Sequence, residues 1–186
     1  MSIGLIVIVA VAAIFLLFLL SAYNGLVRLR NNLRNAASDI DVQLTRRHDL
    51  VPNLVESVKG YMGHERQTLE AVTQARTQAM AISGADLVTR ATAEMALGGA
   101  LKNLFGVAEK YPDLKASQNF MLLEEQLTST ENRIAFARQH YNETVRQFNT
   151  AIAEFPRNMI AGTLGFSSAQ MFAAEEGERT NVPVKV

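Results

Sequence analysis

The sequence predicts an all-α protein in which an N-terminal transmembrane helix continues into an elongated antiparallel four-helix bundle, followed by a short C-terminal helix and an extended tail. Three observations carry this prediction. An uncharged apolar run opens the chain, apolar residues then recur at helical spacing, and the 186 residues contain only 4 Pro and 11 Gly to interrupt them. We therefore expect a transmembrane anchor at 1–24, a helical bundle at 25–162, and a short amphipathic helix with an extended tail at 163–186.

The N-terminal run from Ile3 to Ala22 carries no charged side chain. As a helix it would be about 30 Å long, which matches the hydrocarbon core of a bilayer. The alternatives are a buried core helix, which rarely needs so long an apolar run, and a cleaved signal peptide. A signal peptide should open with Lys or Arg and end in a small-x-small site, whereas Leu20-Ser21-Ala22 is a poor site. We expect an uncleaved anchor.

The charges that follow this run predict its orientation. Residues 23–48 contain more arginines than acidic residues: Arg28, Arg30, Arg34, Arg46 and Arg47, against Asp39 and Asp41. Basic residues near a span tend to stay in the cytoplasm. This predicts a single pass with the short N-terminus outside and the bulk cytoplasmic, with the first three arginines close to anionic headgroups. The alternative is that these arginines serve only the bundle surface.

The first soluble helix has an apolar stripe that Pro52 interrupts. Apolar residues recur in steps of three and four from Leu26 through Leu33, Leu44 and Val55 to Met62. Proline lacks the amide donor and clashes with the carbonyl four residues earlier. We therefore expect a kink or a restarted helix with Asp49 as its cap, and hence a corner or a hinge at Pro52.

Turn residues and heptad spacing predict the later helices. The segment Ser83–Asp86 should end one helix and start the next with Ser83 as its cap, and Tyr111–Asp113 should form another turn. Apolar residues seven apart then define a coiled-coil-like seam: Phe120, Leu127, Ile134, Tyr141 and Phe148. The residues at its second position are mostly small or polar, so we expect one wall of an antiparallel bundle. Ser167–Gln170 resembles a capping box for a short helix that reaches Glu176.

Composition argues against several classes of function. The chain has no Cys, which removes disulfides, thiolate nucleophiles and cysteine-ligated metals, and its formal net charge is zero, which argues against nucleic-acid binding. Phosphate-binding and hydrolase motifs are missing, and His48, His64 and His140 lack metal-ligand spacing. We therefore expect no catalytic residue, no cofactor, no metal and no nucleic-acid partner.

Two polar clusters are candidates for a network between the first and last helices, which are neighbours in an up-and-down bundle. The network would comprise Asp39, Asp41, Arg46, Arg47, His48, Asp49, Glu131, Arg138 and Asn142. One interpretation is a solvated face whose ion pairs contribute ~0–1 kcal/mol each. The other is a buried network that fixes helix register or subunit contacts. The solvated face is favoured for most of these residues, with Arg47 and Arg138 as the candidate exceptions because arginine forms bidentate pairs.

Three segments resemble the LemA family of bacterial membrane proteins. They are residues 23–61, which contain RRHDLVPNLV, residues 110–142, which contain ENRIAFARQHYN, and FNTAIAEFPRNMIAG at 148–162. The resemblance implies a membrane-anchored antiparallel four-helix bundle in a bacterial cytoplasmic (inner) membrane, without an established enzymatic activity. A relative associated with magnetosome membranes implies, by analogy, a role in membrane organisation. The chain departs from the family at Ala37, where an aromatic residue is common, and in its valine-rich C-terminus.

These features favour a non-enzymatic scaffold that contacts the lipid bilayer and self-associates into homo-oligomers to organise or shape the membrane. The alternative is a membrane-tethered adaptor that docks an unidentified cytoplasmic protein through its bundle or its tail. The tail offers a candidate contact patch: Met159, Ile160, Phe166 and Phe172. These residues could instead cover the open end of the bundle. A third hypothesis is an enzyme that uses the Asp/Arg/His cluster around Arg47.

Overall fold

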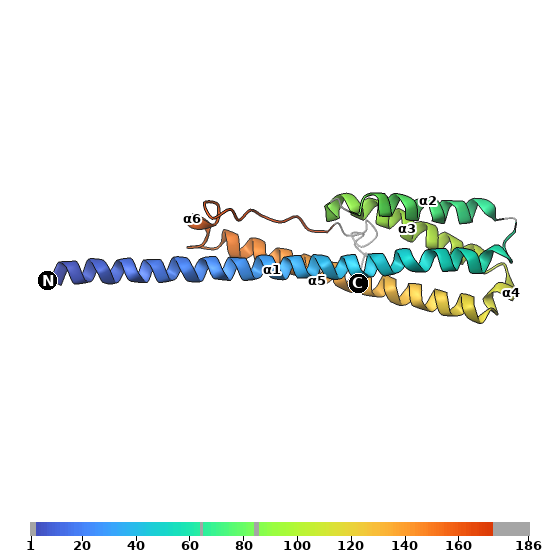
Figure 1. Ribbon diagram of the computed structural model, residues 1–186, viewed down its shortest axis with the longest axis horizontal. Helices are drawn as coiled ribbons and strands as arrows, with labels where there is room; N and C mark the ends of the chain where they lie inside the picture. The colour runs from blue at the N-terminus through green and yellow to red at the C-terminus, as the bar shows by residue number, and fades with distance from the viewer. Residues whose placement is uncertain (1–2, 64, 84–85, 173–186) are drawn as a thin grey trace, which may run out of the picture. The chain divides into compact units, whose positions relative to one another are not determined.

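The computed structural model describes residues 3–63, 65–83 and 86–172, and these residues form helices and loops without a strand (Figure 1). The six helices are α1 (Ile3–Lys59), α2 (Arg66–Ala81), α3 (Leu87–Ala108), α4 (Pro112–Lys115), α5 (Gln118–Ala153) and α6 (Asn158–Ala161). The all-α prediction is confirmed.

The chain divides into two compact units, and α1 and α5 contribute to both. The anchor unit takes the residues up to Ala37 together with His140–Met171, and the bundle unit takes Ser38–Gln139 together with Phe172. The division predicted at residues 24 and 162 stays a prediction.

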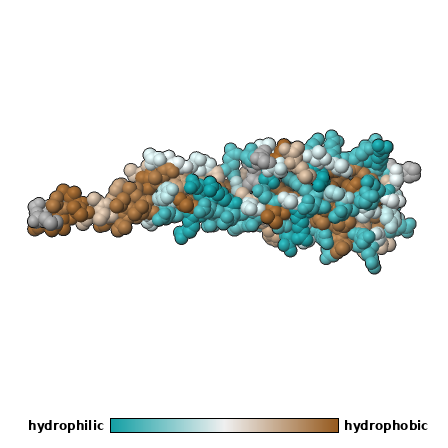
Figure 2. Space-filling model, in the orientation of Figure 1, coloured by the Kyte–Doolittle hydropathy of each residue, from teal (hydrophilic) through white to brown (hydrophobic). Residues whose placement is uncertain are grey.

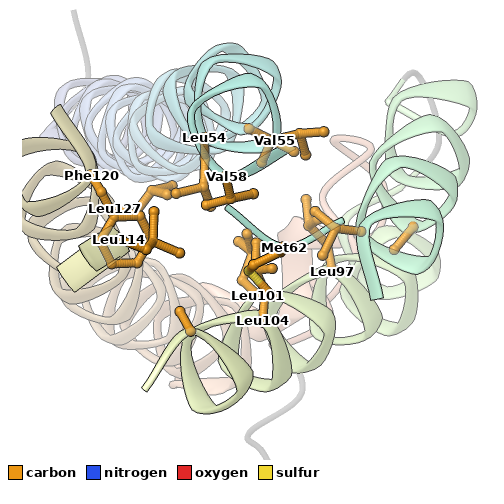
Figure 3. Packing of buried hydrophobic residues seen from close by; sticks show 14 of the residues in the cluster. Leu54, Val55, Val58, Met62, Leu97, Leu101, Leu104, Leu114, Phe120 and Leu127 are labelled. Carbon is orange, nitrogen blue, oxygen red and sulfur yellow. The ribbon is translucent and has the colours of Figure 1, made fainter. Parts of the chain in front are cut away.

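The bundle unit is an antiparallel four-helix bundle. The end of α1, then α2, α3 and the start of α5 alternate in direction along the chain (Figure 1). Their apolar faces meet in one core (Figure 3), whose members recur at helical spacing on each element. The labelled core residues are Leu54, Val55, Val58, Met62, Leu97, Leu101, Leu104, Leu114, Phe120 and Leu127. Burying each large side chain stabilises the bundle by about 1.5–3 kcal/mol.

Helix α1 continues through Pro52 to Lys59, so the predicted restart and corner are wrong, while the predicted kink stays a prediction. Pro52 is exposed, while Val51 and Leu54 beside it are buried in the bundle core. Proline withdraws one backbone donor, and the packing of its neighbours keeps the helix in register across the gap. The chain reverses after Lys59, where backbone bonds from the amides of Tyr61 and Met62 to the carbonyl of Val58 close the turn.

Helix α3 begins with a cap that differs from the prediction. The Asp86 carboxylate accepts hydrogen bonds from the Thr89 amide at 3.0 Å and from the Thr89 hydroxyl at 2.7 Å. Asp86 rather than Ser83 therefore satisfies a free amide of the first turn. The predicted turn at Tyr111–Asp113 contains the short helix α4, which has Pro112 in its first turn.

The heptad seam of α5 is buried along its whole length, as predicted, from Phe120 to Phe148. The chain beyond it differs from the prediction, because residues 166–172 are not helical and the short helix near the C-terminus is α6 instead. The Asn149 side chain explains the difference: its amide donates to the Ala169 carbonyl at 2.9 Å, and its oxygen accepts from the Ala169 amide at 2.8 Å. These bonds hold the segment extended. The rest of the predicted helix and the final NVPVKV lie outside the described residues.

In the anchor unit, the first part of α1 is exposed and apolar. The side chains from Ile3 to Leu17 are exposed, and the surface of this part is hydrophobic (Figure 2). By length and composition α1 can cross a membrane. Further along, Leu26 packs with Phe148, Ala151, Ala161 and Phe166 in a separate core.

Candidate functional site: a buried ionic network in the bundle unit

One arginine joins three helices of the bundle unit. Arg47 of α1 is only 1% exposed, and its Nη1 donates to Glu131 Oε1 of α5 at 2.8 Å. Its Nη2 donates to the Glu94 carbonyl of α3 at 3.2 Å and forms an ion pair with the Glu94 carboxylate. The planar fork of a guanidinium suits such multiple acceptors. Arg47 therefore fixes the positions of α1, α3 and α5 relative to one another.

Glu94 is the acidic centre of this network and is also 1% exposed. Its Oε1 lies 3.0 Å from His48 Nε2, and Arg47 contacts its other oxygen. Burial raises the pKa of Glu94, but the hydrogen bond from His48 and the charge and hydrogen bond of Arg47 outweigh burial and hold this pKa below its ordinary value. Glu94 is thus ionised at neutral pH, as a partner of Arg47 must be.

A second arginine compensates for Pro52. Because proline has no amide hydrogen, the carbonyl of His48, four residues earlier, has no helical donor. Arg76 of α2 supplies one, since its Nε donates to the His48 carbonyl at 2.7 Å. The proline and the arginine together tie α2 to α1 at the level of the buried network.

A groove between α3 and α5 opens above the network, with a volume of about 550 Å³. Arg47 and Glu94 lie on its lining, together with Lys102, Phe105 and Asn132. Because Arg47 and Glu94 are already paired with each other, the arrangement is suited to fixing helix register.

The structure brings together only part of the predicted network. Arg47, His48 and Glu131 meet around Glu94, whereas Asp41 forms a separate pair in which it accepts from Arg90 Nη1 at 2.7 Å. Asp39, Arg46 and Asp49 are exposed, and Asn142 is half-buried. Arg138 lies with its guanidinium 4.7 Å from the centre of the Phe172 ring.

Sequence reasoning missed Glu94, Arg90 and Arg76. Glu94 had a signal, because it is the single acidic residue in α3, a helix otherwise rich in Ala and Leu. A carboxylate that an apolar helix carries into the core needs a partner there. Nothing in the sequence pointed to Arg76, because its role depends on lying close to the His48 carbonyl, and only the folded structure gives that distance.

The predicted tail patch is divided between exposed and buried residues. Met159 is 71% exposed and Ile160 is half-buried, whereas Phe166 and Phe172 are buried. Phe166 belongs to the core of the anchor unit and packs edge-on against Phe148, with ring centres 6.4 Å apart. The four residues do not form one exposed surface.

Comparison with known proteins identifies the family. The model of the LemA family matches residues 36–186, which include the whole ionic network. The chain belongs to the LemA family. It is 31% identical to protein LemA of Metamycoplasma hominis over 164 residues, which cover 86% of this chain and 72% of that protein.

This LemA-family chain is also similar to two proteins whose names refer to magnetosomes. It is 24% identical to magnetosome protein MamQ 2 of Paramagnetospirillum magneticum and 21% identical to magnetosome protein MamQ of Magnetospirillum gryphiswaldense. Both matches cover 85% of this chain and 67% of the relative. None of these names is that of an enzyme. The relatives and the exposed apolar start of α1 fit a membrane-anchored protein.

Proposed function

We propose that this chain is a non-enzymatic, membrane-anchored helical scaffold that self-associates into homo-oligomers and organises or shapes the membrane. It crosses the bacterial cytoplasmic membrane once, with its short N-terminus outside. Support comes from the continuity of α1, which runs from the exposed apolar segment into the bundle core without a break. The exposed Arg28 and Arg34 follow the apolar segment, as basic residues on the cytoplasmic side do.

The observation that carries self-association is an exposed apolar face on α5 in the bundle unit. Met121 is 48% exposed, Leu122 is 53% exposed and Phe136 is 71% exposed. A shallow hollow of about 560 Å³ runs along this face, with Glu124 and Arg133 also on its lining. The polar lining residues lie between Met121 and Phe136 in sequence, and exposed apolar side chains beside polar ones are typical of protein interfaces.

The residues that line this face are complementary to a second copy of themselves. If two copies of α5 lie antiparallel and cross between Thr128 and Ser129, each lining residue meets one of matching chemistry. The pairs are Met121 with Phe136, Glu124 with Arg133, Glu125 with Asn132, and Thr128 with Ser129. Apolar residues thus meet apolar ones, and the acidic end meets the basic end, which is the condition for a two-fold symmetric interface.

Disulfide crosslinking of the full-length chain in membranes tests this pairing, because the chain has no native Cys. In a Met121→Cys/Phe136→Cys variant the two cysteines lie about 22 Å apart on one helix, too far for a bond within one chain. We expect the oxidised double variant to form dimers. A mixture of the two single variants should also form dimers, whereas each single variant alone should remain monomeric. Equal crosslinking of the single variants, or no dimer from the double variant, would contradict the pairing.

The adaptor remains a second candidate, favoured by the exposure of Met159 and Met171. In that case a cytoplasmic protein docks on these side chains. A photoreactive residue in place of Met171 would then capture one discrete protein in native membranes. Capture of lipid or of the chain itself would contradict the adaptor.

A further inference from the structure

The chain turns back against α1 after α5 ends at Ala153, and we call residues 154–165 the end hairpin. The end hairpin contains α6, and its Ala161 is buried against Leu26 of α1. A Cβ atom on Gly25 would lie 3.9 Å from Arg157 Nη2. Tyr23 packs edge-on against Phe166, which directly follows the hairpin, with ring centres 5.9 Å apart.

These contacts place the end hairpin beside residues 22–26 of α1, where the apolar run ends, as the neighbouring positions of α6 and α1 in Figure 1 also show. If residues 3–22 fill the hydrocarbon core, the next turn of α1 lies in the headgroup layer. The end hairpin is then held at the same depth.

The end hairpin exposes large apolar side chains on its free side. Phe155 is 78% exposed, Met159 is 71% exposed and Leu164 is 39% exposed, although Ala161 in the same segment is buried. The hairpin therefore buries a small apolar side chain beside α1 and leaves three large ones open. Aromatic and other apolar side chains are stabilised when they enter the boundary between headgroups and acyl chains.

Basic residues lie next to this open side. Arg157 stands between Phe155 and Met159 in sequence, and Arg28 is exposed one turn beyond the Gly25 contact. Guanidinium groups bind phosphate and are attracted to an anionic membrane surface. Apolar side chains beside arginine at this depth match the chemistry of an anionic lipid layer.

We propose that the end hairpin is a second membrane contact, in which Phe155 and Met159 enter the interfacial layer of an anionic leaflet and Arg157 binds lipid phosphate. The inference rests on the proposed membrane anchoring. Two contacts restrict the rotation of α1 about its own axis, which a single span leaves free. The chain would thus present the rest of its surface to its neighbours in a defined direction.

Single cysteines test the depth of the end hairpin in the full-length chain, reconstituted in vesicles of phosphatidylcholine and phosphatidylglycerol. A fluorophore on Met159→Cys is compared with one on Leu17→Cys, inside the apolar run, and one on Met80→Cys, an exposed site on α2. We expect lipids with a nitroxide near the top of the acyl chain to quench the Met159 label strongly. The Met80 label should respond to aqueous iodide instead.

The outcomes separate this inference from the proposed function. Lipid quenching at Leu17 with only iodide quenching at Met159 would leave the anchor intact and overturn the second contact. A lack of lipid quenching at Leu17 would overturn the anchoring itself. A Met159 label that neither quencher reaches would show that a second copy of the chain covers the hairpin, which also overturns the inference.

Arg157→Gln tests the phosphate contact, with Arg146→Gln as the control because Arg146 is exposed and pairs with Glu143. We expect Arg157→Gln to lower lipid quenching of the Met159 label by about twofold in vesicles with phosphatidylglycerol. The same variant should have little effect in pure phosphatidylcholine. Free inorganic phosphate in place of the anionic lipid should not restore the difference, and restoration would assign the site to a soluble anion.

Discussion

At the scale of single residues, the bundle depends on how its buried polar groups find partners. Arg47, Glu94 and His48 form a network that a solvated face would not need, and Arg76 supplies the donor that Pro52 removes. Arg47 was a candidate for a buried pair because arginine forms bidentate pairs with carboxylates, and the structure places it at 1% exposure. It did not indicate Arg76, because the need for a donor appears only when the helix is known to continue through the proline.

The Arg76 contact predicts a stability change that depends on Pro52. Replacing Arg76 with Met leaves the His48 carbonyl without a donor, so the free energy of unfolding should fall by about 1–3 kcal/mol. In a Pro52→Ala background the helix supplies the amide itself, so the same replacement should have a much smaller effect. Chemical denaturation followed by circular dichroism measures both differences. An equal loss in the two backgrounds would show that Arg76 acts through another contact.

The Arg47–Glu94 pair predicts strong coupling between two substitutions. Arg47→Met leaves the buried Glu94 carboxylate with His48 but without its arginine, and should lower the free energy of unfolding by about 3–5 kcal/mol. Glu94→Leu should cost less, because Arg47 keeps its hydrogen bond to Glu131. The double variant should recover much of this loss, because an apolar pair replaces two buried charges. Additive losses in a double-mutant cycle would contradict a direct pair.

The same pair predicts how stability depends on pH. Because the pKa of Glu94 is lower in the folded chain than its ordinary value of 4.5, its contribution is fully present above that value. The contribution is lost as the pH falls through the lower, folded-state pKa. The Arg47→Met/Glu94→Leu variant should therefore lose less stability on acidification than the unmodified chain. Parallel pH profiles for the two chains would contradict this assignment.

At the scale of elements, periodicity predicted the helices, while the contacts that end or extend them were harder to predict. The heptad spacing of apolar residues in α5 predicted the buried positions from Phe120 to Phe148. An apolar stripe of that length fits few structures other than a helix. Pro52 indicated a corner because proline ordinarily interrupts a helix. In this chain the tertiary packing of the neighbouring residues keeps the helix continuous. Ser167–Gln170 indicated a helix because the hydrogen bonds of Asn149, 20 residues away, have no sequence signature.

Asn149 should therefore control the extended segment after the end hairpin. Asn149→Ala removes both hydrogen bonds to Ala169, so amide exchange at Ala169 should become faster and the free energy of unfolding should fall by about 1–3 kcal/mol. Thr150→Ala is the control, because Thr150 is the exposed neighbour. Hydrogen exchange followed by mass spectrometry measures the first effect. Unchanged protection of Ala169 in Asn149→Ala would show that other contacts hold the segment.

At the scale of the whole molecule, two helices contribute to both units and carry the proposed membrane contact and the surface proposed for self-association. Helix α1 carries the apolar run and part of the bundle core, and α5 carries both the buried seam and the exposed face around Phe136. Membership of the LemA family, the apolar start of α1 and the exposed face of α5 favour a structural role in the membrane. The ionic network fits that role, because a scaffold needs helices in a fixed register.

The exposed face of α5 predicts that one substitution changes assembly without changing the fold. Phe136→Glu places a charge opposite the apolar Met121 of the second copy, so dimers should dissociate while the helical signal stays unchanged. Met80→Glu is the matched control, since Met80 is an exposed apolar residue on α2. Native mass spectrometry in mild detergent compares the two variants. Dimers that persist in Phe136→Glu would assign the interface to another surface.

The most direct test of self-association is the mass of the full-length chain in mild detergent, beside a chain that lacks residues 1–24. Self-association through α5 predicts a discrete dimer for the full-length chain, since a two-fold pairing closes at two copies, and a weaker dimer without the anchor. A full-length chain that remains monomeric at membrane-like density would contradict the scaffold.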